Sequence, residues 1–207
     1  MIQFKPEDYL ISLKDRPLNN EGLFGEEILL NNPLIDILCE RMRNEYVPQH
    51  KFALFSLCTK TRPYMKSKKW QYFNMYFGNY CDFIVCSNGG IIPIEYQYCY
   101  PFQTYNAPAT KKCDELYKQK FKQRLDLFLE KHMYKWDKII FTFLPNSRNR
   151  QVVQQYESNK IYVIPSMEVY NDIQINGSPR LNTQRYPQCA NQHINEIFKI
   201  LGVNYDI

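Results

Sequence analysis

A run of reactive and polar side chains follows the best strand candidate of this 207-residue chain. The strand candidate is Lys51–Ser56, and the segment Leu57–Ser67 comes directly after it. That segment carries a thiol, a guanidinium, a phenol and a hydroxyl, on Cys58, Arg62, Tyr64 and Ser67. Because open α/β sheets bind ligands at the carboxyl ends of their strands, these residue types in this place predict a ligand site.

A second candidate follows the strand Asp82–Cys86. The turn Ser87-Asn88-Gly89-Gly90 contains two glycines, which permit positive φ angles and a close approach of backbone to a ligand. It leads into Ile91–Glu95, where Glu95 is the leading carboxylate. Each choice has a structural alternative. The turn could be only a turn, Cys58 a small buried residue, and Glu95 the partner of Arg62 in a structural ion pair.

The surrounding elements alternate between helices and short apolar strands. Apolar spacing predicts helices over 33–46, 70–77, 111–137 and 150–158, with a last one around Ile194 to Leu201, and further strands over 138–143 and 160–164. This alternation predicts an α/β three-layer sandwich with a mostly parallel central sheet. The stretch 171–191, rich in Asn, Gln, Pro and Ser, is expected to be a loop that serves as a lid or a substrate-contacting insert.

The length and the net charge of the chain limit the number of domains and the kind of partner that such a site could bind. With 44% hydrophobic residues, the chain is expected to form a single domain over 1–207. The formal net charge of +5 suits a phosphate-bearing partner. We expect phosphate contacts from the lysines beside the first candidate loop, which are Lys60, Lys66, Lys68 and Lys69. The basic face of the helix over 111–137 is more typical of a solvated surface. The sequence does not indicate an oligomeric state.

The numbers and spacing of cysteines and histidines exclude disulfide-stabilised and zinc-binding classes of protein. The seven cysteines form no Cys-x-x-Cys pair and only three histidines are present, so neither a disulfide framework nor a zinc cluster is encoded. We expect no metal and no cofactor. The amino terminus lacks the pattern of a signal peptide, and no apolar run of about 20 residues follows. The expectation is a soluble cytoplasmic protein without a membrane partner.

Several spaced motifs, in one order, resemble a known family. They are Asn32-Pro33-Leu34 through Pro48, Leu57 to Ser67, Val85 to Glu95, Tyr100 to Pro108 and Trp136 to Ile140. In order and spacing they resemble the domain shared by archaeosine synthase and archaeal tRNA-guanine transglycosylase. The resemblance covers a core over 31–145, which leaves 146–207 as the carboxyl-terminal completion of the domain.

The family signature is matched only in part. It reads Pro-Cys, three residues, Lys-Pro-Tyr, two residues, Ser, two residues, His. Its matching positions here are Cys58, Pro63, Tyr64 and Ser67, whereas Leu57, Arg62 and Trp70 stand for the proline, the lysine and the histidine. A guanidinium stays protonated at any working pH, so Arg62 cannot act as a nucleophilic amine.

More distantly, such domains resemble the uracil-DNA glycosylase superfamily, which implies a pocket for a flipped base. Extracting a base costs a few kcal/mol of unstacking, which an aromatic sandwich and edge hydrogen bonds offset. Stacking is expected from Tyr64, Tyr105 and Trp70. The expected base-binding residues are Cys58, Arg62, Tyr64, Ser67, Ser87, Gly89, Gly90, Tyr105 and Asn106.

The leading functional hypothesis is a DNA N-glycosylase that flips out and excises a modified base, with modified phage DNA as a candidate substrate. Breaking an N-glycosidic bond passes through an oxocarbenium-like state, so a carboxylate or amide must position water and stabilise the sugar. Glu95 and Asn88 are the expected catalytic residues. The alternatives are a module that binds tRNA or DNA for another subunit, and a 7-deazaguanine tRNA-modification protein. DNA is the favoured partner, and tRNA is the second.

Overall fold

The computed structural model describes residues 25–98, 102, 109–177 and 187–203. Its centre is a five-stranded sheet in the order β3-β2-β1-β4-β5. The strands are β1 (Phe52–Leu57), β2 (Cys81–Ser87), β3 (Gly90–Pro93), β4 (Lys138–Thr142) and β5 (Ile161–Ile164). All neighbouring pairs are parallel except β2 and β3, which pair antiparallel.

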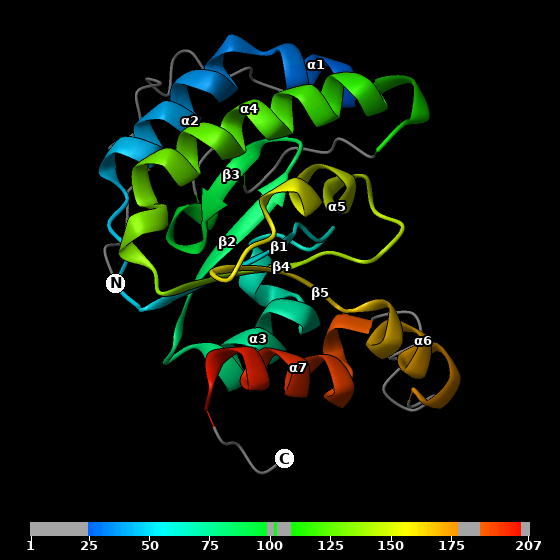
Figure 1. The fold of residues 1–207 in the computed structure, drawn as a ribbon. Coiled ribbons are helices and arrows are strands. Elements are labelled where there is room, and N and C mark those ends of the chain that lie inside the picture. Colours follow the sequence, from blue (N-terminus) through cyan, green and yellow to red (C-terminus); the bar gives the residue numbers. More distant parts are fainter. Residues whose placement is uncertain (1–24, 99–101, 103–108, 178–186, 204–207) are drawn as a thin grey trace.

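Helices cover both faces of the sheet (Figure 1). On one face lie α1 (Glu26–Asn31), α2 (Pro33–Glu45), α4 (Asp114–His132) and α5 (Arg148–Val153). On the other lie α3 (Lys68–Phe77), α6 (Met167–Asn176) and α7 (Asn191–Leu201). This arrangement confirms the expected three-layer α/β sandwich with a mostly parallel sheet. The predicted strands appear as near-continuous buried runs, as expected for a sheet covered on both faces.

Aromatic side chains fill the space between the sheet and each helical layer. On the α4 side, the ring centroid of Phe55 lies 6.2 Å from that of Phe128. On the α3 side, Phe83 packs at 6.0 Å from Trp70. Because successive strand residues point to opposite faces, each strand contributes to both halves of the core. The layers are therefore joined through the sheet into one packed unit.

The amino ends of the strands are joined by one buried carboxylate. The indole Nε1 of Trp136 donates to Asp82 Oδ2 at 2.8 Å, and the backbone N–H of Gln49 donates to the same carboxylate at 3.1 Å. His50 Nδ1 lies 2.8 Å from the other oxygen. These contacts tie the segments before β1 and β4 to β2, so this edge of the sheet is occupied by structural polar pairs.

Three predicted elements differ from the structure. The helix expected over 150–158 begins and ends earlier, because α5 spans Arg148–Val153 and a 3₁₀ turn follows at Gln154–Tyr156. The helix expected over 111–137 is shorter, because 3₁₀ turns at Lys111–Cys113 and Met133–Lys135 flank α4. The loop expected over 171–191 is wrong in its first part, because α6 continues to Asn176, and a 3₁₀ turn lies near its end at Pro187–Cys189. Residues 178–186 of that stretch lie outside the described residues. Ser166 caps this helix by accepting from the N–H of Val169, and Ile173 is fully buried. Capping and packing against α7 thus override a loop-like composition.

None of the helices in the part of the chain that the structure describes is long and apolar enough to cross a membrane.

Candidate functional site at the carboxyl edge of the sheet

The sheet has a topological switch point between β1 and β4. From β1 the chain runs to α3 on one face and then to β2, whereas from β4 it runs to α5 on the other face and then to β5. In open α/β sheets, ligands bind where neighbouring connections diverge in this way, outside the carboxyl ends of the strands. We call the segments that follow these two strands, residues 58–69 and 143–148, the switch-point edge.

Three of the four predicted phosphate-binding lysines point to solvent at the switch-point edge. Lys60, Lys66 and Lys68 are exposed. Lys69 instead turns inward, where its Nζ donates to Ser56 Oγ at 3.1 Å and to the backbone carbonyl of Leu57. Two of the three N–H donors of Nζ are thus bonded to the end of β1, and the phosphate contact of Lys69 stays a prediction.

The predicted base-stacking rings after β1 are enclosed. Tyr64 and Trp70 are both 0% exposed, so neither presents a ring face to a base. The Arg62 guanidinium covers Tyr64 at 4.6 Å from its ring centroid. The expectation that these two rings stack on a flipped base is wrong for this structure, because both rings are packed in the hydrophobic core.

Ser67 and Cys58 have local structural partners. The Ser67 hydroxyl caps α3 by accepting from the N–H of Trp70 at 3.5 Å, which explains why a serine precedes this helix. Cys58 is half-buried, and its N–H donates to the Cys86 carbonyl at 2.9 Å, extending the pairing of β1 with β2. The Cys58 thiol remains at the switch-point edge, whereas the Ser67 hydroxyl serves as the amino-terminal cap of α3.

The glycine turn between β2 and β3 is shaped by packing. The Gly89 N–H donates to Ser87 Oγ at 2.9 Å. Gly90 has φ 118°, and a Cβ there would lie 2.3 Å from the Sγ of Cys39 on α2. The glycine at 90 is thus required by a positive φ and by the close approach of α2, which is a structural reason for the sequence signal.

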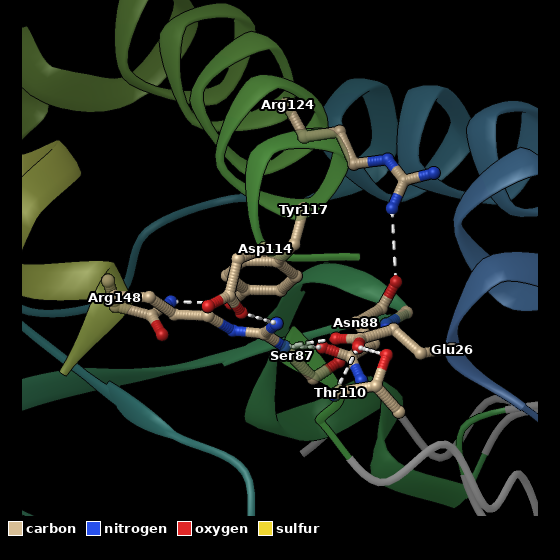
Figure 2. A network of polar contacts seen from close by, with 10 residues as sticks. Glu26, Ser87, Asn88, Thr110, Asp114, Tyr117, Arg124 and Arg148 are labelled. Carbon is tan, nitrogen blue, oxygen red and sulfur yellow. Dashed lines mark hydrogen bonds and ion pairs between the residues drawn. The ribbon is translucent and has the colours of Figure 1, made fainter. Parts of the chain in front are cut away.

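Asn88 is held by two arginines from different helices (Figure 2). Its side-chain Oδ1 accepts from Arg148 Nη2 at 3.0 Å, and its backbone carbonyl accepts from Arg124 Nη1 at 3.2 Å. Because β1 lies between β2 and β4, the Asn88–Arg148 contact joins the carboxyl ends of the two strands that flank β1. The predicted catalytic amide is therefore a member of a polar network.

Arg148 is the centre of that network. Its Nη1 donates to Asp114 Oδ1 at 3.0 Å, its Nη2 donates to Glu26, and its guanidinium lies 3.6 Å from the ring centroid of Tyr117. The Glu26 side chain is 0% exposed, and its other oxygen accepts from Thr110 N at 2.6 Å. We call these residues, with Asn88, the Arg148 network.

Sequence reasoning missed Arg148 and Glu26. A signal for Arg148 existed, because it follows the strand at 138–143 in the same way that the predicted segment follows the first strand. No local signal marks Glu26, which meets Arg148 across 122 positions of the chain.

Glu95 does not lie with Asn88. Strand β3 runs antiparallel from Gly90, opposite Ser87, to Pro93, opposite Ile84. Glu95 therefore follows the end of β3 that points toward the amino end of β2. Burial raises the pKa of Glu95 to about 7, and the charge of Asp82 adds to the rise. The expected convergence of Glu95 with the carboxyl-edge residues is wrong, because the antiparallel register carries it the other way.

The predicted base-binding residues Tyr105 and Asn106 lie outside the described residues. Within the described ranges, no group of three or more His, Cys, Asp or Glu side chains is arranged to hold a metal ion. What the switch-point edge offers is a set of exposed ammonium groups, a thiol, the inward amine of Lys69 and the charged Arg148 network. Such groups can bind a polyanion and position an electrophile.

Comparisons with known proteins agree with the family motifs. Residues 35–174 match the family model described as a domain of unknown function, DUF5591. The chain is 34% identical over 100 residues to the archaeosine synthase subunit alpha of Methanosarcina acetivorans, a match that covers 46% of this chain and 16% of that protein. The archaeosine synthase resemblance is thereby confirmed. The uracil-DNA glycosylase resemblance stays a prediction.

A solved structure shares the fold. The crystal structure of AF0587, a protein of unknown function, superposes with a TM-score of 0.55 at 14% sequence identity, covering 82% of this chain and 51% of that one. This chain therefore spans about half of the solved relative and a small part of the curated one.

Proposed function

We propose that this chain, which belongs to the family of the domain of unknown function DUF5591, is a nucleic-acid-binding module of tRNA modification. In this proposal the switch-point edge binds the tRNA. The observation that carries the proposal is the cluster of exposed lysines there, Lys60, Lys66 and Lys68. The similarity to an archaeosine synthase subunit supports tRNA as the nucleic acid.

The distribution of charge supports this surface over the basic helix α4. On α4, Lys118, Lys120 and Lys122 each contact a carboxylate. No ion pair within the described ranges includes Lys60, Lys66 or Lys68. Unneutralised positive charge therefore collects beside the end of β1, which is the arrangement that releases counterions from a phosphate backbone.

The DNA glycosylase hypothesis has weaker support. Its carboxylate, Glu95, follows the end of β3 that points away from the carboxyl edge, and the Asn88 amide oxygen accepts from Arg148. Tyr64 is buried. These positions do not support the predicted arrangement of water-positioning and stacking groups for base excision. The similarity to the archaeosine synthase subunit likewise favours tRNA modification or nucleic-acid binding.

The test is the salt dependence of tRNA binding, measured by fluorescence anisotropy on the full chain. Neutralising about three phosphates predicts a log–log slope of about −2 to −3. Replacing Lys60, Lys66 and Lys68 together by Gln should bring the slope close to zero and weaken binding by tenfold or more. A slope that is flat in the unmodified protein would overturn the proposal.

A matched control removes the same charge elsewhere. Lys131, Lys135 and Lys199 are exposed on other elements, and their triple Gln variant should bind tRNA with nearly unchanged affinity. Equal losses in both triple variants would show unspecific attraction instead of a docking surface. Duplex DNA carrying varied modified bases is the parallel substrate, and strand scission after alkali treatment would favour the glycosylase hypothesis.

A further inference from the structure

Tyr98 is an exposed aromatic residue beside the switch-point edge. It is 56% exposed and is the last residue of the 3₁₀ turn η5 (Ile94–Tyr98). The other described aromatic residues of η5 and of the switch-point edge are enclosed, since Tyr64 and Phe143 are 0% exposed and Tyr96 is 2% exposed. Within these described segments, Tyr98 is therefore the ring that a ligand can reach.

A hydrogen bond joins η5 to the switch-point edge. The side-chain Oε1 of Gln97 accepts from the backbone N–H of Met65 at 2.8 Å. Tyr98 follows Gln97 in the chain, and the exposed Lys66 follows Met65. The bond thus brings the exposed ring and an exposed ammonium group each within one residue of a shared contact.

The backbone that carries the ring is held in place by buried neighbours. Tyr96 and Gln97, the two residues before Tyr98, are both buried. The turn η5 also packs against β2, β3 and the 3₁₀ turn η4 (Tyr64–Lys66). A tyrosine on a fixed backbone has only two side-chain torsions to restrict, so it loses little conformational entropy when a ligand covers its ring.

An exposed ring beside ammonium groups is the combination that holds unpaired nucleotides. The exposed Lys66 and Lys68 supply positive charge for a phosphate backbone, and a tyrosine ring offers a face on which any base can stack. In a continuous RNA duplex the bases already stack on one another, so a protein ring reaches base faces mainly in loops, bulges and ends. These two features together favour unpaired nucleotides over a duplex.

We propose that Tyr98 stacks on an unpaired base of the nucleic acid whose phosphates contact Lys66 and Lys68. The preferred ligand of the switch-point edge is then RNA with unpaired nucleotides, and not a continuous helix. This inference rests on the proposed function and deepens it by naming the part of the RNA that binds. It gives the stacking role, which the buried Tyr64 and Trp70 cannot take, to a ring that is exposed.

The experiment compares two RNA probes, whose binding to the full chain is measured by fluorescence anisotropy. One is a mixed-sequence single strand of about 12 nucleotides, and the other is the blunt duplex of that strand with its complement. Tyr98→Ala should bind the single strand at least about fivefold more weakly, as expected for the loss of one stacked base, and should bind the duplex within about twofold of the unmodified protein. Tyr98→Phe should keep the affinity for the single strand, because stacking needs the ring and not the hydroxyl.

The salt dependence separates stacking from charge. Tyr98→Ala removes no positive charge, so its log–log salt slope on the single strand should equal that of the unmodified protein. The triple Gln variant of Lys60, Lys66 and Lys68 should instead flatten the slope.

The matched control is Tyr134, an exposed tyrosine beside a lysine at the other edge of the sheet. It is 71% exposed, and Lys135 Nζ lies 5.9 Å from its ring centroid in the 3₁₀ turn that precedes β4. Tyr134→Ala should bind both probes within about twofold of the unmodified protein.

Three results would overturn the inference: single-strand binding unchanged in Tyr98→Ala, an equal loss on both probes, or an equal loss in Tyr134→Ala. Binding that depends on Lys60, Lys66 and Lys68 but not on Tyr98 would refute only this inference. A flat salt slope in the unmodified protein would refute the proposed function, whatever the effect of Tyr98→Ala.

Discussion

The Arg148 network predicts a large and specific loss of stability when its centre is removed. Replacing Arg148 by Met keeps much of the apolar stem and deletes the guanidinium. Among the described residues, Glu26, whose side chain is 0% exposed, then keeps only the hydrogen bonds from Thr110. Asn88 and Asp114 lose the same partner. The carboxyl ends of β2 and β4 are no longer joined on this side of β1.

The magnitude follows from the burial of the carboxylate. Breaking a buried ion pair by removing one partner costs about 3 to 5 kcal/mol. The hydrogen bonds that Thr110 still donates to Glu26 place the expected loss at the lower end of that range. In a domain of this size each kcal/mol moves the melting temperature by about 2 to 4 °C. Arg148→Met should therefore melt about 6 to 12 °C below the unmodified protein.

Urea unfolding followed by tryptophan fluorescence measures this loss, because Trp70 and Trp136 are both 0% exposed in the fold. Adding Glu26→Gln to Arg148→Met should recover about 2 kcal/mol, since the unpaired charge is then absent. The control is Arg41→Met, which breaks the part-exposed Arg41–Glu45 pair and should cost less than about 1 kcal/mol. A loss in Arg148→Met no larger than in the control would refute the reasoning.

Two further predictions concern the two ends of β3, which begins at Gly90 and is followed by Glu95. Burial raises the pKa of Glu95 to about 7, above its unfolded value of about 4.3, so the unfolded chain releases the proton first and stability falls as the pH rises between those values. Glu95→Gln should flatten this fall in urea midpoints measured from pH 4.5 to 8, and an unchanged slope would contradict the assignment. Gly90→Ala should lower the free energy of unfolding by about 2 kcal/mol or more, because it combines a positive φ with a Cβ 2.3 Å from Cys39 Sγ. Gly202→Ala, where φ is +72° and no atom of the described residues lies within 4 Å of the new Cβ, should cost about half as much, and equal losses would exclude the packing argument.

Local patterns in the sequence predicted most of the elements. The apolar runs at β1, β2 and β4 are short, bounded by polar residues and long enough to cross a core, so they predict buried strands without knowledge of their partners. Serines before α3 and α5 cap those helices through a hydrogen bond within a few residues. In contrast, α6 was missed because its stability depends on packing Ile173, which composition does not report.

The functional residues depended more on long-range structure. The sequence by itself determined that polar and basic residues follow the central strand, and that a glycine turn follows the next one. Only the tertiary structure decided that Lys69 faces inward while Lys68 faces solvent, since side-chain direction on a helix depends on what packs against it. The antiparallel register of β3 moved Glu95 away from Asn88, and folding brought Glu26 to Arg148 from 122 positions away. Strand pairing and helix packing set which of these residues lie close together. Neither can be predicted from the spacing of residues along one segment.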